Sequence, residues 1–232
     1  MALLLTMPVA GTTAQEFEPE RFDAMSGERS GRVGGVTLGR PLWKAKWGFN
    51  ANLEPAAAEN LRAFFARLRG GQRAFLTHDR SRAFPAAYPG GFGGMVKAGG
   101  GAFTGACSGW SQAIDANGDA AITLSGLPAN FALSLNDYIG LKWDAAGSSA
   151  GSYDRRALAR VVVATVGSGA GVASAIVEPP IDTLVVPAGA VAYLDTPACR
   201  MKLLSGESSL GALGTMMKIE GGTISAIEDL RP

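Results

Sequence analysis

The feature that most constrains the fold is a single helical stretch set between two β-like stretches. Residues 57–79 read AAENLRAFFARLRGGQRAFLTHD. Apolar side chains recur at i, i+3, i+4 and i+7 of this stretch, at Leu61, Phe64, Phe65 and Leu68. Pro55 suits the first turn of a helix, and Gly70 and Gly71 suit a left-handed C-terminal cap. The spacing predicts an amphipathic helix of about fifteen residues.

The residues on both sides of this helix have the pattern of strands. In LWKAKWGFNANLE, residues 42–54, apolar and polar side chains alternate, and Trp43 and Trp47 fall on the apolar face. Period two predicts a half-buried strand. The segment RAFLTHD after the helix resumes as a strand, and we expect another at Ala2 to Met7. This N-terminal run lacks the basic segment of a secretion signal, and Pro8 cuts it short, so we expect a cytoplasmic, soluble product.

The rest of the chain predicts a loop-rich, mainly β protein. Glycine makes up 32 of 232 residues, roughly twice its usual share, which indicates many tight turns. Residues 15–35 are polar and glycine-rich and predict a long loop or extended arm. Residues 81–105 predict a linker into a second domain or a loop exposed at an interface. From about Ala102 onward, short β-prone runs separated by turn sequences suggest a small sandwich or barrel.

Composition excludes several classes of function. Lys plus Arg is 21 against 20 for Asp plus Glu, so no global positive field favours nucleic acid or an anionic membrane. No apolar run approaches the ~18 residues of a membrane span. Cys107 and Cys199 lie far apart in the sequence, which leaves a single disulfide open but gives no metal-binding pair. We predict no cofactor and no metal.

The motifs that could carry chemistry are weak. His78 is the only histidine and is the first candidate for a catalytic base. A base of this kind needs a nucleophile beside it, and the sequence GACSGW around Ser108 only superficially resembles a nucleophile elbow. We therefore favour the interpretation that His78 is a structural residue at the end of a strand. The run DANGD has acidic residues at calcium-loop spacing but lacks the required glycine and glutamate. An Asn117-Gly118 hairpin turn explains it better. The run GSGAG after Val166 does not complete a dinucleotide motif and predicts a hairpin loop.

Arginines cluster on the predicted helix. Arg62 and Arg69, with Arg67 and Arg73, could bind phosphate, but the face opposite an apolar stripe is ordinarily charged. We therefore expect a solvated or subunit-contacting face.

Three stretches together resemble a known family. These are residues 42–79 (LWKAKWGFNANLEPAAAENLRAFFARLRGGQRAFLTHD), residues 122–141 (ITLSGLPANFALSLNDYIGL) and the final strands RMKLLSG and TISAIEDLRP. Their order resembles tail-tip proteins of long-tailed bacteriophages and prophages of Gram-negative bacteria, and more narrowly distal tail proteins. These components of the baseplate hub join the tail tube to the tip.

The resemblance implies a two-domain architecture. The hub domain, a tail-tube-like β-sandwich with one flanking helix, would comprise residues 1–91 and 199–232. A second, outer β domain, a small sandwich or barrel, would be inserted at residues 92–198. The family forms a hexameric ring around the DNA channel and has no catalytic residues, so the resemblance implies a virion protein of the tail tip, assembled in the host cytoplasm and not an enzyme.

The implied partners are other copies of the chain and the neighbouring tail components. These are the tail tube protein, the proteins of the hub and baseplate, and the tape measure protein as a further candidate; DNA would only pass through the channel, and no membrane insertion is expected. A ring subunit must bury surfaces on both flanks. Our candidate ring contacts are the arm of residues 15–35 and the side chains of Trp43, Trp47, Arg62 and Arg69.

Two other functions remain open at this point. The outer domain could be a carbohydrate-binding baseplate module that contacts the host surface, using aromatic rings that stack on sugars. The candidate rings are Trp110, Tyr138, Trp143 and Tyr153, and the competing explanation is that these rings fill the core. A cell-wall hydrolase acting through His78 or paired carboxylates is the enzymatic alternative.

Overall fold

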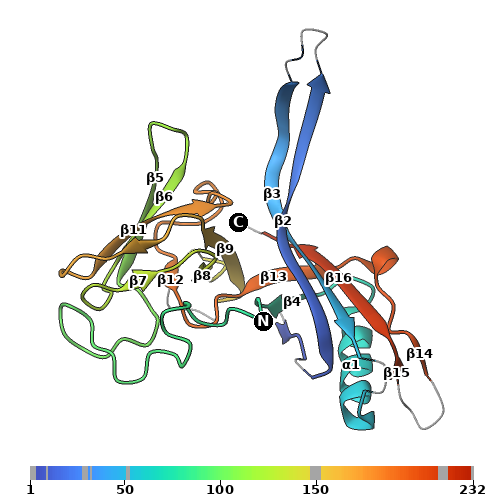
Figure 1. The fold of residues 1–232 in the computed structure, drawn as a ribbon. Coiled ribbons are helices and arrows are strands. Elements are labelled where there is room, and N and C mark those ends of the chain that lie inside the picture. Colours follow the sequence, from blue (N-terminus) through green and yellow to red (C-terminus); the bar gives the residue numbers. More distant parts are fainter. Residues whose placement is uncertain are drawn as a thin grey trace. The chain divides into compact units, whose positions relative to one another are not determined.

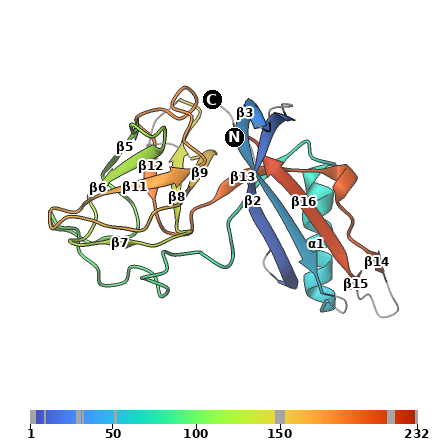
Figure 2. The same ribbon diagram turned by 45° about the horizontal axis from the view of Figure 1, so that its top comes forward.

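The computed structural model describes residues 4–8, 10–27, 31, 33–50, 53–146, 153–213 and 219–230. The fold is mainly β, as the sequence predicts, with one α-helix among the described residues. The chain divides into two compact units. We call residues 5–75 and 201–229 the helix unit, and residues 76–200, which come between them in sequence, the inserted unit. Figures 1 and 2 show the elements of both.

The helix unit is built on a six-stranded sheet with the order β1-β4-β13-β16-β3-β2. The strands of this sheet are β1 (Leu5–Thr6), β2 (Thr12–Gly27), β3 (Val33–Phe49), β4 (Ala74–Thr77), β13 (Cys199–Leu203) and β16 (Gly222–Glu228), of which β4 and β13 run across the division between the units. The pairs β2–β3, β3–β16 and β16–β13 are antiparallel. The unit is completed by α1 (Pro55–Leu68), the short 3₁₀ helix η1 (Ser205–Glu207) and the small pair β14 (Ala212–Leu213) and β15 (Ile219–Glu220).

The predicted strand–helix–strand core is confirmed. Trp43 and Trp47 are fully buried on one face of β3, and Ala58, Leu61, Phe64 and Leu68 form the buried side of α1. Phe75 of β4 joins the two, since its ring lies 5.3 Å from Phe64 in an edge-on arrangement and 6.4 Å from the ring of Trp47. The helix therefore covers the tryptophan face of the sheet, beside β3 and β16 (Figures 1 and 2).

The helix ends one residue earlier than predicted. Arg69, rather than Gly70, is the first residue in the left-handed conformation, with φ 51° and ψ 51°. Gly70 and Gly71 follow with positive φ. Glycine is required at position 71, because a Cβ there would lie 2.6 Å from the carbonyl oxygen of Leu203 on β13. The two glycines thus serve the close return to the sheet as well as the cap.

The prediction of a loop at residues 15–35 is wrong in its secondary structure. Residues 15–27 and 33–35 belong to a long antiparallel hairpin of β2 and β3, with register shifts at Thr12/Ala14, Glu20/Phe22 and Phe22/Asp23, while residues 28–30 and 32 lie outside the described part of the chain. The polar composition hid strands whose side chains lie largely in solvent. The alternative expectation of an extended arm matches what Figure 1 shows, with the hairpin rising well beyond its neighbours in the sheet.

The inserted unit is a second antiparallel sheet, of order β12-β8-β9-β11-β6-β5. Its strands are β5 (Gly109–Ile114), β6 (Ala120–Ser125), β8 (Tyr138–Trp143), β9 (Arg155–Val161), β11 (Val172–Glu178) and β12 (Val191–Tyr193), with β7 (Ala132–Leu133) pairing β10 (Thr165–Val166) beside it. The two edges of the sheet meet, because Ala106 bridges Tyr193 and the Cys107 N–H donates to the Ala192 carbonyl oxygen. The closed sheet surrounds an apolar core.

The turn that joins β5 and β6 confirms the hairpin interpretation of DANGD. Asp115 Oδ1 accepts hydrogen bonds from the backbone N–H groups of Asn117 and Asp119, at 2.8 and 2.9 Å. Gly118 has φ +90°, which glycine adopts without strain. The Asp115 side chain therefore shapes a turn.

The glycine-rich segment of residues 81–105 is part of the inserted unit and not a linker. Phe92 and Phe103 are buried in that unit's core, with ring centroids 4.9 Å apart. The fully buried carboxylate of Asp137 fixes the start of the segment by accepting hydrogen bonds from Arg82 Nη1 at 3.0 Å and the Ala86 N–H at 2.8 Å. The division between the units accordingly falls at residues 75 and 76, earlier than the expected boundary at residue 91.

Candidate functional site

The surface that stands out in the helix unit is the free part of the β2–β3 hairpin. β16 pairs with β3 between Lys44 and Phe49, and the Glu228 carboxylate then accepts a hydrogen bond from the Trp43 N–H at 3.2 Å. Beyond this point, the described residues of β3 pair with β2 alone. We call this two-stranded part, residues 21–27 and 33–42, the arm.

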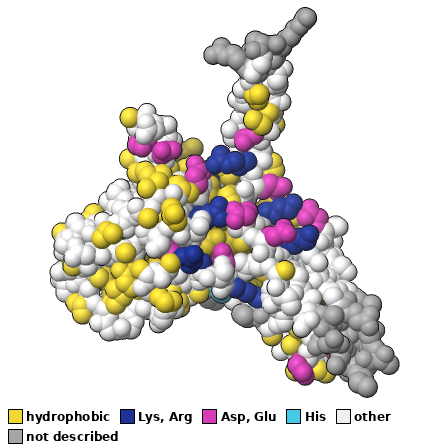
Figure 3. Space-filling model, viewed as in Figure 1, with side chains coloured by type: hydrophobic (Ala, Val, Ile, Leu, Met, Phe, Trp, Pro, Cys, Tyr) yellow, Lys and Arg dark blue, Asp and Glu magenta, His cyan; other side chains and the backbone are white. Residues whose placement is uncertain are grey.

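The arm exposes a set of large apolar side chains. The exposed fractions are 40% for Phe22, 75% for Met25, 65% for Val33, 65% for Val36 and 72% for Leu38. Alternation along β2 places Phe22 and Ala24 on one face, and Val36 lies opposite Ala24. The register shift between Phe22 and Asp23 leaves Leu38 as the extra residue of β3, which with Gly39 opposes Phe22 and so lies on the same face. Figure 3 shows hydrophobic side chains along the arm. Sequence reasoning located the arm but missed this face, because period two within residues 22–38 is interrupted by glycines and bulges.

The outer edge of β2 changes character along its length. The part of β2 before the arm contains Pro19 together with Glu16, Glu18 and Glu20. Proline and charged side chains on an edge strand discourage pairing with another chain. From Phe22 to Gly27 the described edge has one charged side chain, Asp23. Protection from association thus weakens where the apolar face begins.

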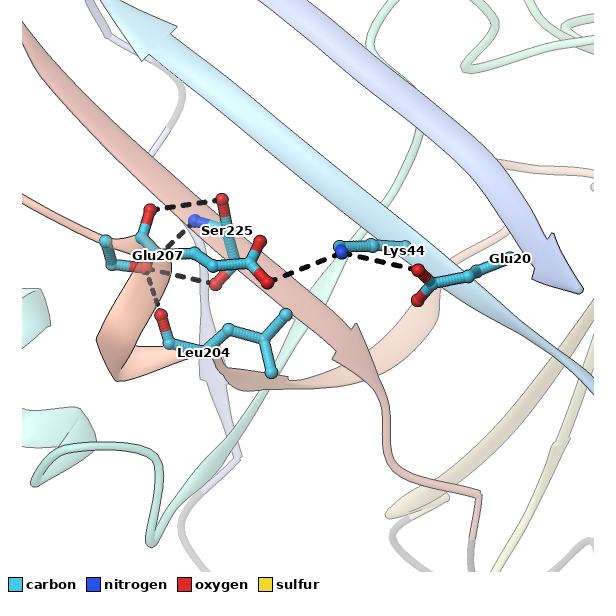
Figure 4. Close-up of polar contacts among 6 residues, drawn as sticks. Glu20, Lys44, Leu204, Glu207 and Ser225 are labelled. Atoms are coloured by element: carbon cyan, nitrogen blue, oxygen red, sulfur yellow. Dashed lines mark hydrogen bonds and ion pairs between the residues drawn. The ribbon is translucent and has the colours of Figure 1, made fainter. Parts of the chain in front are cut away.

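The face of the sheet below the arm is charged with alternating sign. Glu16 lies opposite Lys46 and Glu18 opposite Lys44 in the β2–β3 register. Lys44 Nζ lies 3.4 Å from both Glu20 Oε1 and Glu207 Oε1, as Figure 4 shows. Figure 3 shows Lys and Arg interspersed with Asp and Glu in this region.

The carboxylates hold the charge of Lys44. Desolvation acts to lower the pKa of Lys44, but attraction from Glu20 and Glu207 outweighs it, and the pKa is raised. The ammonium therefore stays protonated, and its charge is offset by its own neighbours. Hydrogen bonds from serine side chains hold η1 to β16. One of them fixes the position of Glu207, because Ser225 Oγ donates to the Glu207 carbonyl oxygen at 3.3 Å.

Of the four residues that we predicted as ring contacts, two are buried and two are exposed. Trp43 and Trp47 have exposed fractions of 0%, so their side chains cannot reach a neighbouring molecule, and that part of the prediction is wrong. They fall on the inward face of β3, which the helix covers. Arg62 and Arg69 are exposed on α1 and at its C-terminal end and remain available for contact.

The four candidate sugar-stacking residues also differ in their exposure to solvent. Trp143 and Tyr138 are buried, with exposed fractions of 1% and 4%, so they do not present a ring to a ligand. Trp110 is half-buried against the core of the inserted unit. Tyr153 is half-exposed, and the Lys142 ammonium lies 4.9 Å from the centre of its ring.

His78 follows directly after β4 and is half-buried. Desolvation is the main cause that lowers its pKa, followed by the charge of Arg80, while Asp79 acts in the opposite direction. The Asp79 carboxylate accepts hydrogen bonds from Tyr138 Oη at 2.8 Å and from Ser81 Oγ at 2.6 Å. Asp79 therefore takes part in the local structure at the end of the strand.

The cysteines and acidic residues give no metal site in the described part of the chain. Cys107 and Cys199 are buried thiols and form no disulfide with each other. Burial raises the pKa of Cys107 to about 12, against a smaller opposing effect of Lys97. A thiol with that pKa is not a nucleophile at neutral pH.

No protein-family model matches this chain, and no curated protein is significantly similar to it. Among the described residues, no helix has the length and apolar character needed to span a bilayer.

Proposed function

We propose that this chain is a structural virion protein of a phage tail tip, a distal tail protein whose copies assemble into a hexameric ring between the tail tube and the baseplate hub. The observation that carries the proposal is the arm of residues 21–27 and 33–42, with its exposed apolar face. The proposal assigns no reaction to the chain. It adds a physical reason for assembly to the sequence resemblance to distal tail proteins.

A two-stranded ribbon with an uncovered apolar face is a poor structure for an isolated monomer. Two-stranded hairpins are marginally stable in water and need packing on one face. Val36 and Leu38 of this face are 65% and 72% exposed, so burying them against a neighbour would release apolar surface from water. The occupant that we propose is the next copy of the same chain, because a projecting arm that packs on a different surface of an identical subunit gives the head-to-tail contacts of a ring.

The charge pattern of the sheet face fits a channel through which DNA moves. Lys44 is held by Glu20 and Glu207, so its positive charge is already offset within the subunit. A surface of unpaired lysines would bind phosphates and hold DNA in place. We propose that this mixed face, with Glu16 and Glu18 opposite Lys46 and Lys44, lines the channel.

The proposed partners follow from this position. The ring would contact the tail tube protein on one side and proteins of the hub and baseplate on the other, with the tape measure protein as a further partner and DNA passing through. The chain would be made in the host cytoplasm and incorporated into the virion. The protein should accordingly be recovered in purified tails.

Site-specific photo-crosslinking tests the role of the arm. A benzophenone amino acid at Val36 should give a ladder of crosslinked species that extends to the hexamer. The same group at Leu184, which is 96% exposed on the inserted unit, serves as the matched control and should give at most a weak dimer band. A single monomer band from the Val36 variant would refute the proposed contact.

A further inference from the structure

A second feature lies wholly within the inserted unit. A cavity of about 410 Å³ opens beside β8, β9 and β12, and its polar lining comes from Thr104, Lys142, Arg156, Tyr193, Asp195 and Thr196. This volume lies within the range of small-molecule sites and exceeds the needs of a single water molecule. The cavity is therefore large enough for a group the size of a monosaccharide.

The cavity wall holds two cations in an unfavourable arrangement. Lys142 of β8 and Arg156 of β9 are direct cross-strand partners, and like charges at such positions repel each other. The Lys142 ammonium lies 4.9 Å from the ring centres of both Tyr153 and Tyr193. Among the described residues, none provides it with a hydrogen bond or an ion pair within 4 Å.

The pKa of Lys142 agrees with this geometry. Desolvation is the main cause that lowers the pKa of Lys142, and Arg156 adds to the effect, while Asp195 opposes it. Arg156 is occupied, because its Nη1 donates to the backbone carbonyl oxygens of Tyr153 and Arg155. Lys142, which has no such acceptor among the described residues, is thus the cation more available to a ligand.

The backbone around the cavity is specialised. Gly140 faces Tyr193, and a Cβ on Gly140 would lie 2.6 Å from the tyrosine ring, so only glycine lets the ring lie at this place. Thr196 has φ +50°, a conformation that is rare for a β-branched residue. Such strain concentrates at ligand sites, where the surrounding structure maintains it.

The lining also offers partners for hydroxyl groups. Asp195 Oδ1 accepts a hydrogen bond from Thr196 Oγ1 at 3.0 Å, which places a carboxylate and a hydroxyl side by side at the cavity. A carboxylate accepts hydrogen bonds from sugar hydroxyls, but it repels a ligand that is only an anion. An ammonium whose charge is only partly compensated, next to such a group, therefore favours a ligand that carries both an anionic group and hydroxyls.

We propose that this cavity binds an acidic sugar unit of the uronic acid type. The sugar carboxylate pairs with Lys142, and its hydroxyl groups bond to Asp195 and Thr196. The site lies within the inserted unit and does not depend on ring formation. It takes a ligand class that suits surface polysaccharides, and it uses Tyr153 as a support for Lys142 rather than as a platform on which a ring stacks.

The test is a titration of the full-length, isotope-labelled protein with glucuronate, glucose and inorganic phosphate, followed by NMR. Glucuronate should bind saturably and shift the amide signals of β8 and of residues 193–196, at least tenfold more tightly than glucose, as expected for one charge-assisted hydrogen bond. Lys142→Met should weaken the binding of glucuronate at least tenfold. Lys97→Met, which removes a lysine elsewhere in the same unit, should leave it unchanged.

The remaining outcomes each overturn part or all of the proposal. Equal affinity for phosphate and glucuronate would show that the site recognises only an anion and not a sugar. The absence of saturable shifts with glucuronate would show that the cavity is not a binding site for it. If Lys142→Met fails to fold, acetylation of the wild-type protein gives the same information. Glucuronate should then protect Lys142, but not Lys97, from the reagent, and equal labelling with and without glucuronate would contradict the proposal.

Discussion

Replacing Leu38 by alanine should weaken assembly while leaving the fold of the subunit intact. Leu→Ala removes about three carbon groups, worth ~2.4 kcal/mol when they are fully buried. The Leu38 side chain is 72% exposed in the single chain, so roughly that share of the surface becomes available for burial by a neighbour. The expected loss is about 1.7 kcal/mol for each contact, or roughly a 15-fold lower association constant.

Sedimentation velocity over a dilution series measures this change, because the midpoint of dissociation should move to a higher subunit concentration. Leu184→Ala is the control, since Leu184 is 96% exposed on the other unit and should not alter assembly. The free energy of unfolding of Leu38→Ala in the dissociated subunit should change by no more than about 0.5 kcal/mol. If Leu38→Ala dissociates at the same concentration as the wild type, the apolar face of the arm is not a contact.

Three further predictions concern stability and thiol chemistry. Gly71→Ala should lower the free energy of unfolding by about 2–3 kcal/mol, because it combines φ +89° with a Cβ 2.6 Å from a backbone carbonyl oxygen, whereas Gly99→Ala has open space and should change it little in the same urea titration. Asp137→Ala should lower the free energy of unfolding by about 3 kcal/mol, because Arg82 and backbone N–H groups lose their buried acceptor. The control Asp119→Ala, at an exposed position, should lower it by about a few tenths of a kcal/mol. Equal chemical denaturation midpoints for the two variants would show that the buried carboxylate is dispensable. Finally, a disulfide reagent such as Ellman's reagent should detect neither buried thiol in the native protein and both after unfolding in guanidinium, and rapid reaction of native Cys107 would contradict its burial.

Sequence patterns predicted the parts of the fold that local chemistry determines. The period of Leu61, Phe64 and Leu68 gave the helix, and the alternation around Trp43 and Trp47 gave the strand, because each pattern records which side faces the core. Turn residues located the β5–β6 hairpin. These features need only neighbouring residues to be recognised.

The misses have a common physical cause. Residues 15–27 and 33–35 form strands that lie mostly in solvent, so no burial pattern distinguishes them from a loop. The glycine-rich segment packs through isolated aromatic rings such as Phe92 and Phe103, whose partners come from other parts of the chain. The tryptophans of β3 were assigned to an outer surface although their alternation equally allowed the inner one. The opposition of Lys142 and Arg156 depends on the β8–β9 register, which sequence alone does not define.

The central claim, assembly into a hexameric ring, is tested most directly by negative-stain imaging of the purified protein, with its mass in solution measured on the same sample. The account predicts six-fold rings with a central opening and a mass of about 143 kDa, six times the 23.8 kDa of the chain. A uniform 23.8 kDa monomer at every concentration tested, with no rings on the grid, would contradict it.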